Sequence, residues 1–240
     1  MSRSTRPADP GRAMTLALQV LLAVAYAVLA HMASLRQDEA LAAGALVALV
    51  LLVLAAPLAA RRPWAWVLLP LLLAATWALW RGGHAAQPLL LVPVAFILLI
   101  GSWFGRSLRR GKVPLITRIV SALEGVPAAQ VAPDLRAYTR SLTQVWAALL
   151  LLLAAINLVL ALIAAPDGLL ASAGIESPVS ISRQQWSWFA NLFTYGIVGG
   201  AFAVEYAIRK RRFPGRYRSF AEFLRKLAAL GPAFWKDFRR

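Results

Sequence analysis

Six long apolar stretches dominate the pattern of hydrophobic and polar positions along the chain. Each is close to the length of about 20 residues that a helix needs to cross roughly 30 Å of hydrocarbon. They run from Met14 to Ser34, Ala40 to Ala60, Pro63 to Trp80, Gln87 to Phe104, Thr143 to Ala165 and Trp186 to Ile208. They are rich in Leu and Ala and lack the period-two alternation of a membrane β-barrel. The pattern predicts an all-α polytopic membrane helix bundle with about six transmembrane helices.

A shorter segment between the fourth and fifth stretches has apolar residues on one helical face. In "LITRIVSALEG" the positions Leu115, Ile119 and Leu123 recur at helical spacing, Pro114 precedes the first turn and Gly125 follows the last. Basic residues surround this segment, which predicts an amphipathic helix in the cytoplasmic headgroup region. The following residues should wind directly into the fifth span, with Asp134 as a candidate cap.

The C-terminal tail repeats this design. Ser219 and Glu222 form a capping box ahead of an apolar helical face, and Gly231 ends the pattern. The chain therefore divides into a cytoplasmic segment 1–13, a transmembrane domain 14–208 with an amphipathic insertion 105–142, and a basic amphipathic tail 209–240. The tail is expected to lie on the membrane surface, with a partner protein as the alternative.

Composition and charge agree with a membrane protein. The chain is 60% hydrophobic and only 15% charged, against about 25% charged residues in an average soluble domain. All but three of the 26 Lys and Arg residues fall in alternate connections and the two terminal segments, the exceptions being Arg36, Arg81 and Arg183. Cationic loops stay in the cytoplasm, so both termini are predicted to be cytoplasmic.

The net charge of +16 is assigned to anionic lipid rather than nucleic acid, because the cations flank apolar spans. Eight of the nine Trp residues, Trp146 among them, lie at span ends, where indole rings prefer the membrane interface. The cations predicted to bind the membrane surface or a partner are Arg109, Arg110, Lys112, Arg118, Arg209, Lys210, Arg211 and Arg212.

Candidate chemistry is sparse in this sequence. The chain has no Cys, which excludes disulfides, thiol catalysis and thiolate metal sites. His31 and His84 are too few for a metal centre, which normally has three or four ligands. No catalytic motif is present, so we predict no cofactor, no metal and no catalytic residues, and a protein that is not an enzyme is favoured.

Polar residues within the spans form a candidate polar site: Glu205, Arg140, Tyr138, Asn157 and Asn191. Three roles are open for Glu205: an ion-paired anchor, a contact to substrate or headgroup, and a proton relay. The anchor is favoured because Arg209 follows at i+4, and Arg140 and Tyr138 could add a second tether across the bundle. Asn157 and Asn191 could hydrogen-bond across a helix pair or line a polar cavity. Gly196 and Gly200 form a G-x-x-x-G spacing, which indicates close helix packing.

Three stretches carry a family resemblance: "ITRIVSALEG", "LRAYTRSLTQVWAALLLLLAAINLVLAL" and "WSWFANLFTYGIVGGAFAVEYAIRKRRFPG". Together they cover roughly Pro114 to Gly215. This part of the chain resembles an uncharacterised family of bacterial integral membrane proteins found among genes for aryl polyene and xanthomonadin-type pigments. The matching elements include Tyr138 to Arg140, Asn157, Asn191 and Glu205 with Tyr206.

The resemblance implies an inner-membrane accessory protein for making or exporting an aryl polyene-type lipid or pigment. Its expected partners are membrane lipids, with an acyl carrier protein or pigment-biosynthesis enzymes as further candidates for the basic cytoplasmic face. Two other functions are open. One is a membrane-embedded acyl or glycosyl transferase acting on a lipid-linked substrate, which would need Glu205, Tyr138, Arg140 and Asn157 to converge on one cavity. The other is a small lipid or solute transporter.

Overall fold

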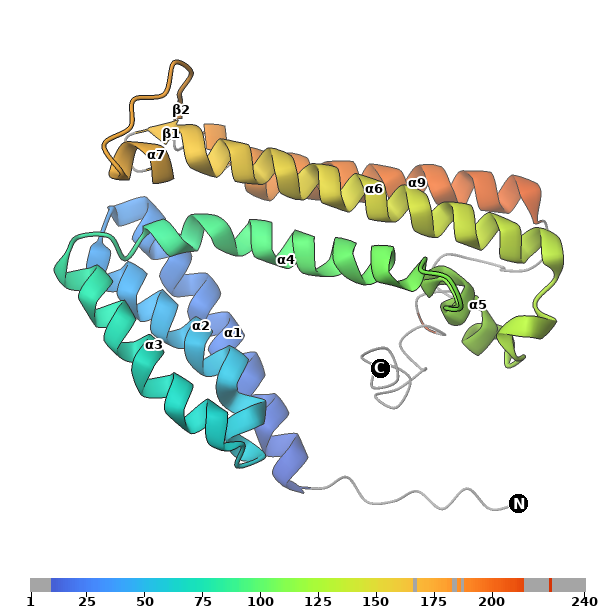
Figure 1. Ribbon diagram of the computed structural model, residues 1–240, viewed down its shortest axis with the longest axis horizontal. Coiled ribbons are helices and arrows are strands. Elements are labelled where there is room, and N and C mark those ends of the chain that lie inside the picture. Colours follow the sequence, from blue (N-terminus) through green and yellow to red (C-terminus); the bar gives the residue numbers. More distant parts are fainter. Residues whose placement is uncertain (1–9, 166–167, 183–184, 187, 214–224, 226–240) are drawn as a thin grey trace. The chain divides into compact units, whose positions relative to one another are not determined.

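The structure is a computed structural model that describes residues 10–165, 168–182, 185–186, 188–213 and 225. It is an all-α membrane helix bundle with one short pair of strands, and it confirms the fold class predicted from the sequence (Figure 1). The chain divides into two compact units, Met1–Val92 and Pro93–Arg240. The division falls inside a helix, immediately before a proline that cannot donate a backbone hydrogen bond.

The first unit contains three long helices and the first turns of a fourth. These are α1 (Pro10–Arg36), α2 (Glu39–Ala59), α3 (Pro63–Arg81) and the start of α4 (Gln87–Ser107). Helix α2 packs against both α1 and α3 (Figure 1). The buried cluster at one end is formed largely by small side chains, among them Ala33, Ala42 and Ala85. Small residues let helices approach closely where lipid supplies no hydrophobic driving force between them.

Two carboxylates organise this end of the first unit. Asp38 caps α2, because its Oδ1 accepts from the backbone N–H groups of Ala40 (2.8 Å) and Leu41 (3.2 Å). Glu39 reaches the connection between α3 and α4, where its Oε2 accepts from Ala85 N (2.6 Å) and Ala86 N (3.2 Å). Two backbone donors at the start of α4, far along the chain from Glu39, are thereby satisfied.

We expect Glu39→Ala to lower the free energy of unfolding by about 2 kcal/mol, since it leaves two partly buried N–H groups without a charged acceptor. Glu39→Gln retains one acceptor oxygen and should lose about half as much. Chemical unfolding in detergent micelles measures both, and equal losses for the two variants would contradict the role of the carboxylate as an acceptor.

The second unit contains two long helices, Pro133–Ile163 and Thr194–Arg212, whose side chains contact each other. It comprises the rest of α4, α5 (Leu115–Glu124), the 3-10 turn η1 (Ala128–Gln130), α6 (Pro133–Ile163), α7 (Leu169–Ser172), the π-helix η2 (Trp188–Phe193) and α9 (Thr194–Arg212). Strands β1 (Ala164–Ala165) and β2 (Ile181–Ser182) pair in parallel between α6 and η2. The amphipathic helix predicted between the fourth and fifth spans is confirmed as α5, which ends at Gly125 in the left-handed conformation.

Large side chains of α4 and α6 form the core of this unit. Ile97 of α4 packs with Trp146, Leu150 and Leu153 of α6. Where these helices meet, a Cβ on Gly101 would lie 3.1 Å from the Leu150 Cβ, which is tighter than most Cβ contacts. The glycine therefore lets α4 and α6 approach slightly more closely than a residue with a side chain would.

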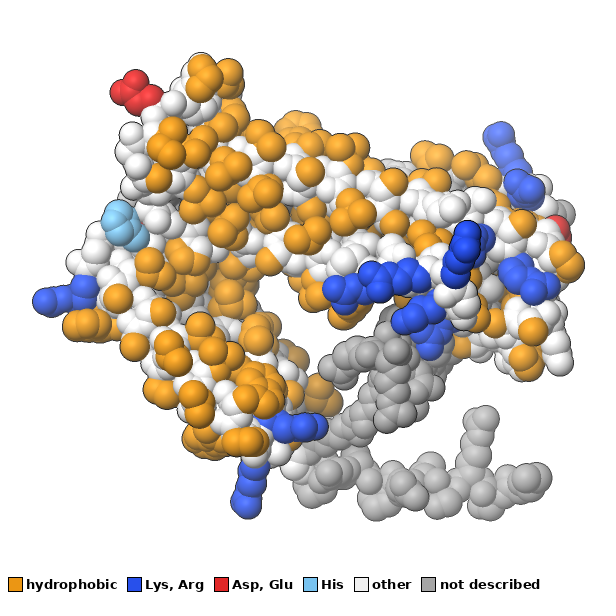
Figure 2. Space-filling view, viewed as in Figure 1, with side chains coloured by type: hydrophobic (Ala, Val, Ile, Leu, Met, Phe, Trp, Pro, Cys, Tyr) orange, Lys and Arg blue, Asp and Glu red, His pale blue; other side chains and the backbone are white. Residues whose placement is uncertain are grey.

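Five of the described helices are long and apolar enough to cross a membrane: Met14–Arg36 within α1, then α2, α3, α4 and α6. Their outer surfaces are covered with hydrophobic side chains (Figure 2), and rings such as Trp66 and Trp77 are more than half exposed. Such exposure suits contact with lipid tails rather than water. The chain is thus a multi-pass membrane protein.

The sixth predicted span corresponds to η2 followed by α9, and α9 is not among those five helices. The last turn of α9 carries four cations, Arg209 to Arg212, and the residues before Thr194 form a π-helix, so the purely α-helical part, although 19 residues long, is strongly charged. Crossing by η2 and α9 together stays a prediction. The C-terminal helix predicted from Ser219 onward lies outside the described residues.

Three local expectations are wrong. Asp134 does not cap α6, because the N-cap is Ala132 and no side chain caps it; Asp134 lies in the first turn instead. Trp146 is 6% exposed in the core and not at the interface. Added Cβ atoms at Gly196 and Gly200 would meet no described atom within 4 Å, so that G-x-x-x-G spacing makes no close helix contact with the described residues.

Candidate functional site

Helices α6 and α9 run side by side and antiparallel (Figure 1). Side-chain contacts join them at three levels. The contacts are Tyr138 with Glu205, Trp146 with Phe202, and Asn157 with Thr194. Between Tyr138 and Asn157, α6 rises about 28 Å at about 1.5 Å per residue. This is close to the roughly 30 Å of a hydrocarbon core. The two polar contacts thus bracket an aromatic one, at a spacing that fits the two edges of the membrane.

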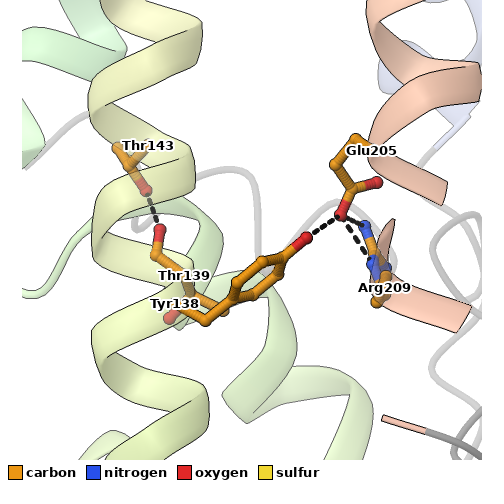
Figure 3. Close-up of polar contacts among 5 residues, drawn as sticks. All are labelled: Tyr138, Thr139, Thr143, Glu205 and Arg209. Carbon is orange, nitrogen blue, oxygen red and sulfur yellow. Dashed lines mark hydrogen bonds and ion pairs between the residues drawn. The ribbon is translucent and has the colours of Figure 1, made fainter. Parts of the chain in front are cut away.

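The carboxylate of Glu205 is held by donors from both helices (Figure 3). Its Oε1 accepts from Arg209 Nε (2.7 Å), Arg209 Nη2 (2.6 Å) and the Tyr138 hydroxyl (3.3 Å). Glu205 is only 7% exposed, against 17% for Arg209. Removing the cation from such a buried pair would be strongly destabilising, because it would leave the carboxylate charge without compensation.

Tyr138 is fixed on more than one side. Its ring contacts Phe213 edge-on, with centroids 5.3 Å apart, and the Arg212 guanidinium lies 5.6 Å from the ring centroid. Cation–π and edge-to-face contacts of this kind each contribute about 1 kcal/mol. The phenol therefore links the start of α6 to the end of α9, and the geometry favours the ion-paired anchor among the three roles open for Glu205.

A ladder of buried threonines docks α5 against the same part of α6. Thr117 and Thr139 share a hydrogen bond between their hydroxyls (2.7 Å), and the Thr143 hydroxyl donates to Thr139 O (2.7 Å, Figure 3). The Thr143 oxygen also accepts from Ile116 N (3.3 Å), while Ser107 Oγ accepts from Leu115 N (2.9 Å). Two N–H groups in the first turn of α5 are thereby satisfied by hydroxyls from α4 and α6.

At the opposite end of the pair, Asn157 is almost fully buried, with 1% exposure. Its Nδ2 donates to Leu153 O (2.8 Å) on its own helix and to Thr194 Oγ1 (3.2 Å) on α9. The Thr194 hydroxyl in turn donates to Phe189 O (2.9 Å) of the π-helix. Among the described residues, Asn157 Oδ1 has no hydrogen-bond partner. The bond across the helix pair thus goes to Thr194, while Asn191 lies in η2 with its side chain outside the described part of the structure.

The candidate polar residues do not converge on one cavity. Arg140 is exposed and lines a groove with Lys112 and Arg136, and no described bond joins it to Glu205. Asn157 lies about 25 Å along α6 from Arg140. A transferase site would need four residues to converge: Glu205, Tyr138, Arg140 and Asn157. Among the described contacts, only Glu205 and Tyr138 touch each other.

The predicted surface cations share one end of the second unit. Arg109, Arg110 and Lys112 are exposed in the connection between α4 and α5, and Arg118 is half-buried on α5. At the end of α9, Lys210, Arg211 and Arg212 are exposed, whereas Arg209 turns inward to Glu205. Within the described residues, no group of three His, Asp or Glu side chains is arranged to hold a metal ion.

Two features were missed at the sequence level. One is the threonine ladder, whose only sequence signal is the i, i+4 spacing of Thr139 and Thr143. The other is Arg136, which shares a helix face with Arg140 at the same spacing. Comparisons with protein-family models, curated proteins and solved structures found no match to this chain.

We expect Arg209→Met to lower the free energy of unfolding by about 2 kcal/mol, because it leaves the buried Glu205 carboxylate without its cation. The same change at exposed Arg211 should cost less than about 0.5 kcal/mol. Adding Glu205→Gln to Arg209→Met should restore part of the loss. Thermal or chemical unfolding in detergent tests this, and equal effects at positions 209 and 211 would rule out the anchor.

Thr194→Val should destabilise the protein by about 1 kcal/mol, because it removes the only described hydrogen bond that joins Asn157 to α9. Thr76→Val is a matched control, since the one described hydrogen bond of the buried Thr76 hydroxyl goes to Leu72 O within its own helix (2.9 Å). The difference between the two variants in unfolding free energy measures the contact across the helix pair. A difference of zero would mean that Asn157 does not hold α6 to α9.

Proposed function

We propose that the protein is a multi-pass accessory protein of the bacterial inner membrane, with both termini in the cytoplasm. Its basic cytoplasmic surface binds anionic lipid headgroups during the assembly or export of an aryl polyene-type lipid or pigment. The pigment assignment rests on the resemblance of residues 114–215 to that family. Lipid binding rests on the arrangement of the cations.

The observation that supports lipid binding is the gathering of cations at one end of the second unit. Antiparallel pairing brings the start of α6 and the end of α9 together, as the contact of Tyr138 with Glu205 shows. Helix α5 packs on the same part of α6 and carries the connection from α4 with it. Figure 2 shows Lys and Arg side chains gathered on this side of the molecule.

A cluster of cations next to membrane spans fits the cytoplasmic leaflet for two reasons. Loops rich in Lys and Arg resist translocation, and anionic lipids attract each such residue by about 1 kcal/mol near the surface. The accessory role is supported by Glu205, which is the one buried carboxylate among the described residues of this region and whose described contacts are those of an anchor.

A deletion strain tests this proposal. Its extracted lipids and pigments are compared after complementation with wild type, with Glu205→Gln, and with Lys210, Arg211 and Arg212 all changed to Gln. Membrane abundance is matched by immunoblotting. We expect deletion to reduce the product or to leave it unexported, Glu205→Gln to restore it, and the triple variant to restore less than about half.

Unchanged pigment and lipid on deletion would refute the pigment role. Failure of Glu205→Gln at equal abundance would make the carboxylate part of a working site rather than an anchor. Full rescue by the triple variant would show that the cations of α9 are dispensable for the function.

A further inference from the structure

A groove of about 520 Å³ opens between α5 and the first turns of α6. Its α6 wall consists of Pro133, Arg136, Ala137 and Arg140, which are spaced i, i+3, i+4 and i+7 and so occupy one helix face. Lys112, in the connection that precedes α5, also lines the groove. The volume falls within the range of about 300–1,000 Å³ that is usual for small-molecule sites.

Three cations line this groove without a described carboxylate among the lining residues. Arg136 and Arg140 are a like-charge pair at i, i+4, which destabilises an isolated helix unless an anion lies between them. Asp134, the carboxylate nearest in sequence, does not line the groove. The positive end of the α6 dipole adds to the same potential.

The groove walls are held rigidly by contacts already formed. The hydroxyl of Thr117, which lines the groove, is hydrogen-bonded to Thr139, and the first turn of α5 is hydrogen-bonded to Thr143 and Ser107. These bonds fix α5 against α6 independently of the three cations. A ligand would therefore meet a largely preformed site, which lowers the entropy cost of binding.

The chemistry of the walls fits an amphiphile. Val113, Pro114 and Ala128 supply apolar surface next to the cations. Arg140 precedes the predicted start of the fifth span, Thr143, by about one helical turn, which places it at headgroup depth. Arg guanidinium groups bind phosphate oxygens through paired hydrogen bonds.

We propose that this groove binds the phosphate group of an anionic membrane lipid, with Arg136, Arg140 and Lys112 as its ligands. The lipid is preferred to a soluble phosphate compound because of the apolar wall and the neighbouring span. The proposal rests on the proposed function, since it needs this end of the protein to face the anionic leaflet. It goes further by assigning one saturable site to named residues.

The test uses the full-length protein in nonionic detergent and native mass spectrometry to count bound lipids. Phosphatidylglycerol is titrated against wild type, against Arg136→Gln with Arg140→Gln, and against Arg109→Gln with Arg110→Gln as the control. Each pair removes two exposed cations, from the connection between α4 and α5 in the control and from α6 in the groove pair, and only the groove pair lines the groove. Thermal unfolding confirms that each variant is folded.

We expect the groove pair to weaken the first phosphatidylglycerol binding step by about tenfold or more, which corresponds to about 1.4 kcal/mol. The control pair should weaken it by less than about threefold, and phosphatidylcholine should not saturate the site. If both pairs weaken phosphatidylglycerol binding equally, the groove is not a specific site. Lipid would then bind a diffuse basic surface, which is still consistent with the proposed function. If neither pair matters and phosphatidylcholine binds equally well, both proposals fail.

A competition arm separates the two sources of phosphate. Glycerol phosphate and inorganic phosphate are added to the complex with phosphatidylglycerol. Displacement only at concentrations about a hundredfold or more above that of the lipid supports a lipid site. Displacement at concentrations comparable to that of the lipid would overturn the lipid assignment in favour of a soluble phosphate ligand.

Discussion

The pairing of α6 with α9 depends on the partners of two buried polar side chains, Glu205 and Asn157. Hydrocarbon offers no hydrogen bonds, so an unpartnered polar group there is costly. At one end the Glu205 carboxylate is satisfied by Arg209 and Tyr138, and at the other the Asn157 amide donates to Thr194. The interior between these contacts is apolar and aromatic. Because the two polar contacts are separated by about the thickness of a hydrocarbon core, they fix the register of the pair.

The long apolar helices and the limits of α5 were predictable because they depend on local signals. Apolar runs set the five long helices, and the prediction of Pro114 and Gly125 as the limits of α5 is confirmed. Hydrophobicity along the chain predicts a membrane span less clearly where apolar and charged residues are mixed. In α9 the cations of the last turn share the helix with Glu205, and residues before Thr194 adopt a π-helix, so the sixth span stays a prediction.

The partners of the polar residues were only partly predictable. The pairing of Glu205 with Arg209 follows from the i, i+4 spacing within one helix. Contacts between helices depend on rotation and register, which one sequence does not encode locally. Tyr138 and Arg140 are two positions apart and therefore about 200° apart around α6. One reaches Glu205 while the other faces a groove, although both lie at the same depth. For the same reason Asn157 meets Thr194, and Trp146 faces the core instead of the interface.

The first turns of α6 thus present two faces with different tasks. Tyr138 points to α9 and fixes the anchor. The opposite face carries Thr139 and Thr143, which bond to α5, and Arg136 and Arg140, which line the groove beside α5. This separation frees Arg140 from Glu205, because Arg209 already neutralises that carboxylate. Had Arg140 served as the second tether, the groove would have lost one of its three cations. The anchor within α9 therefore leaves the charge on α6 available for an anion at the membrane surface.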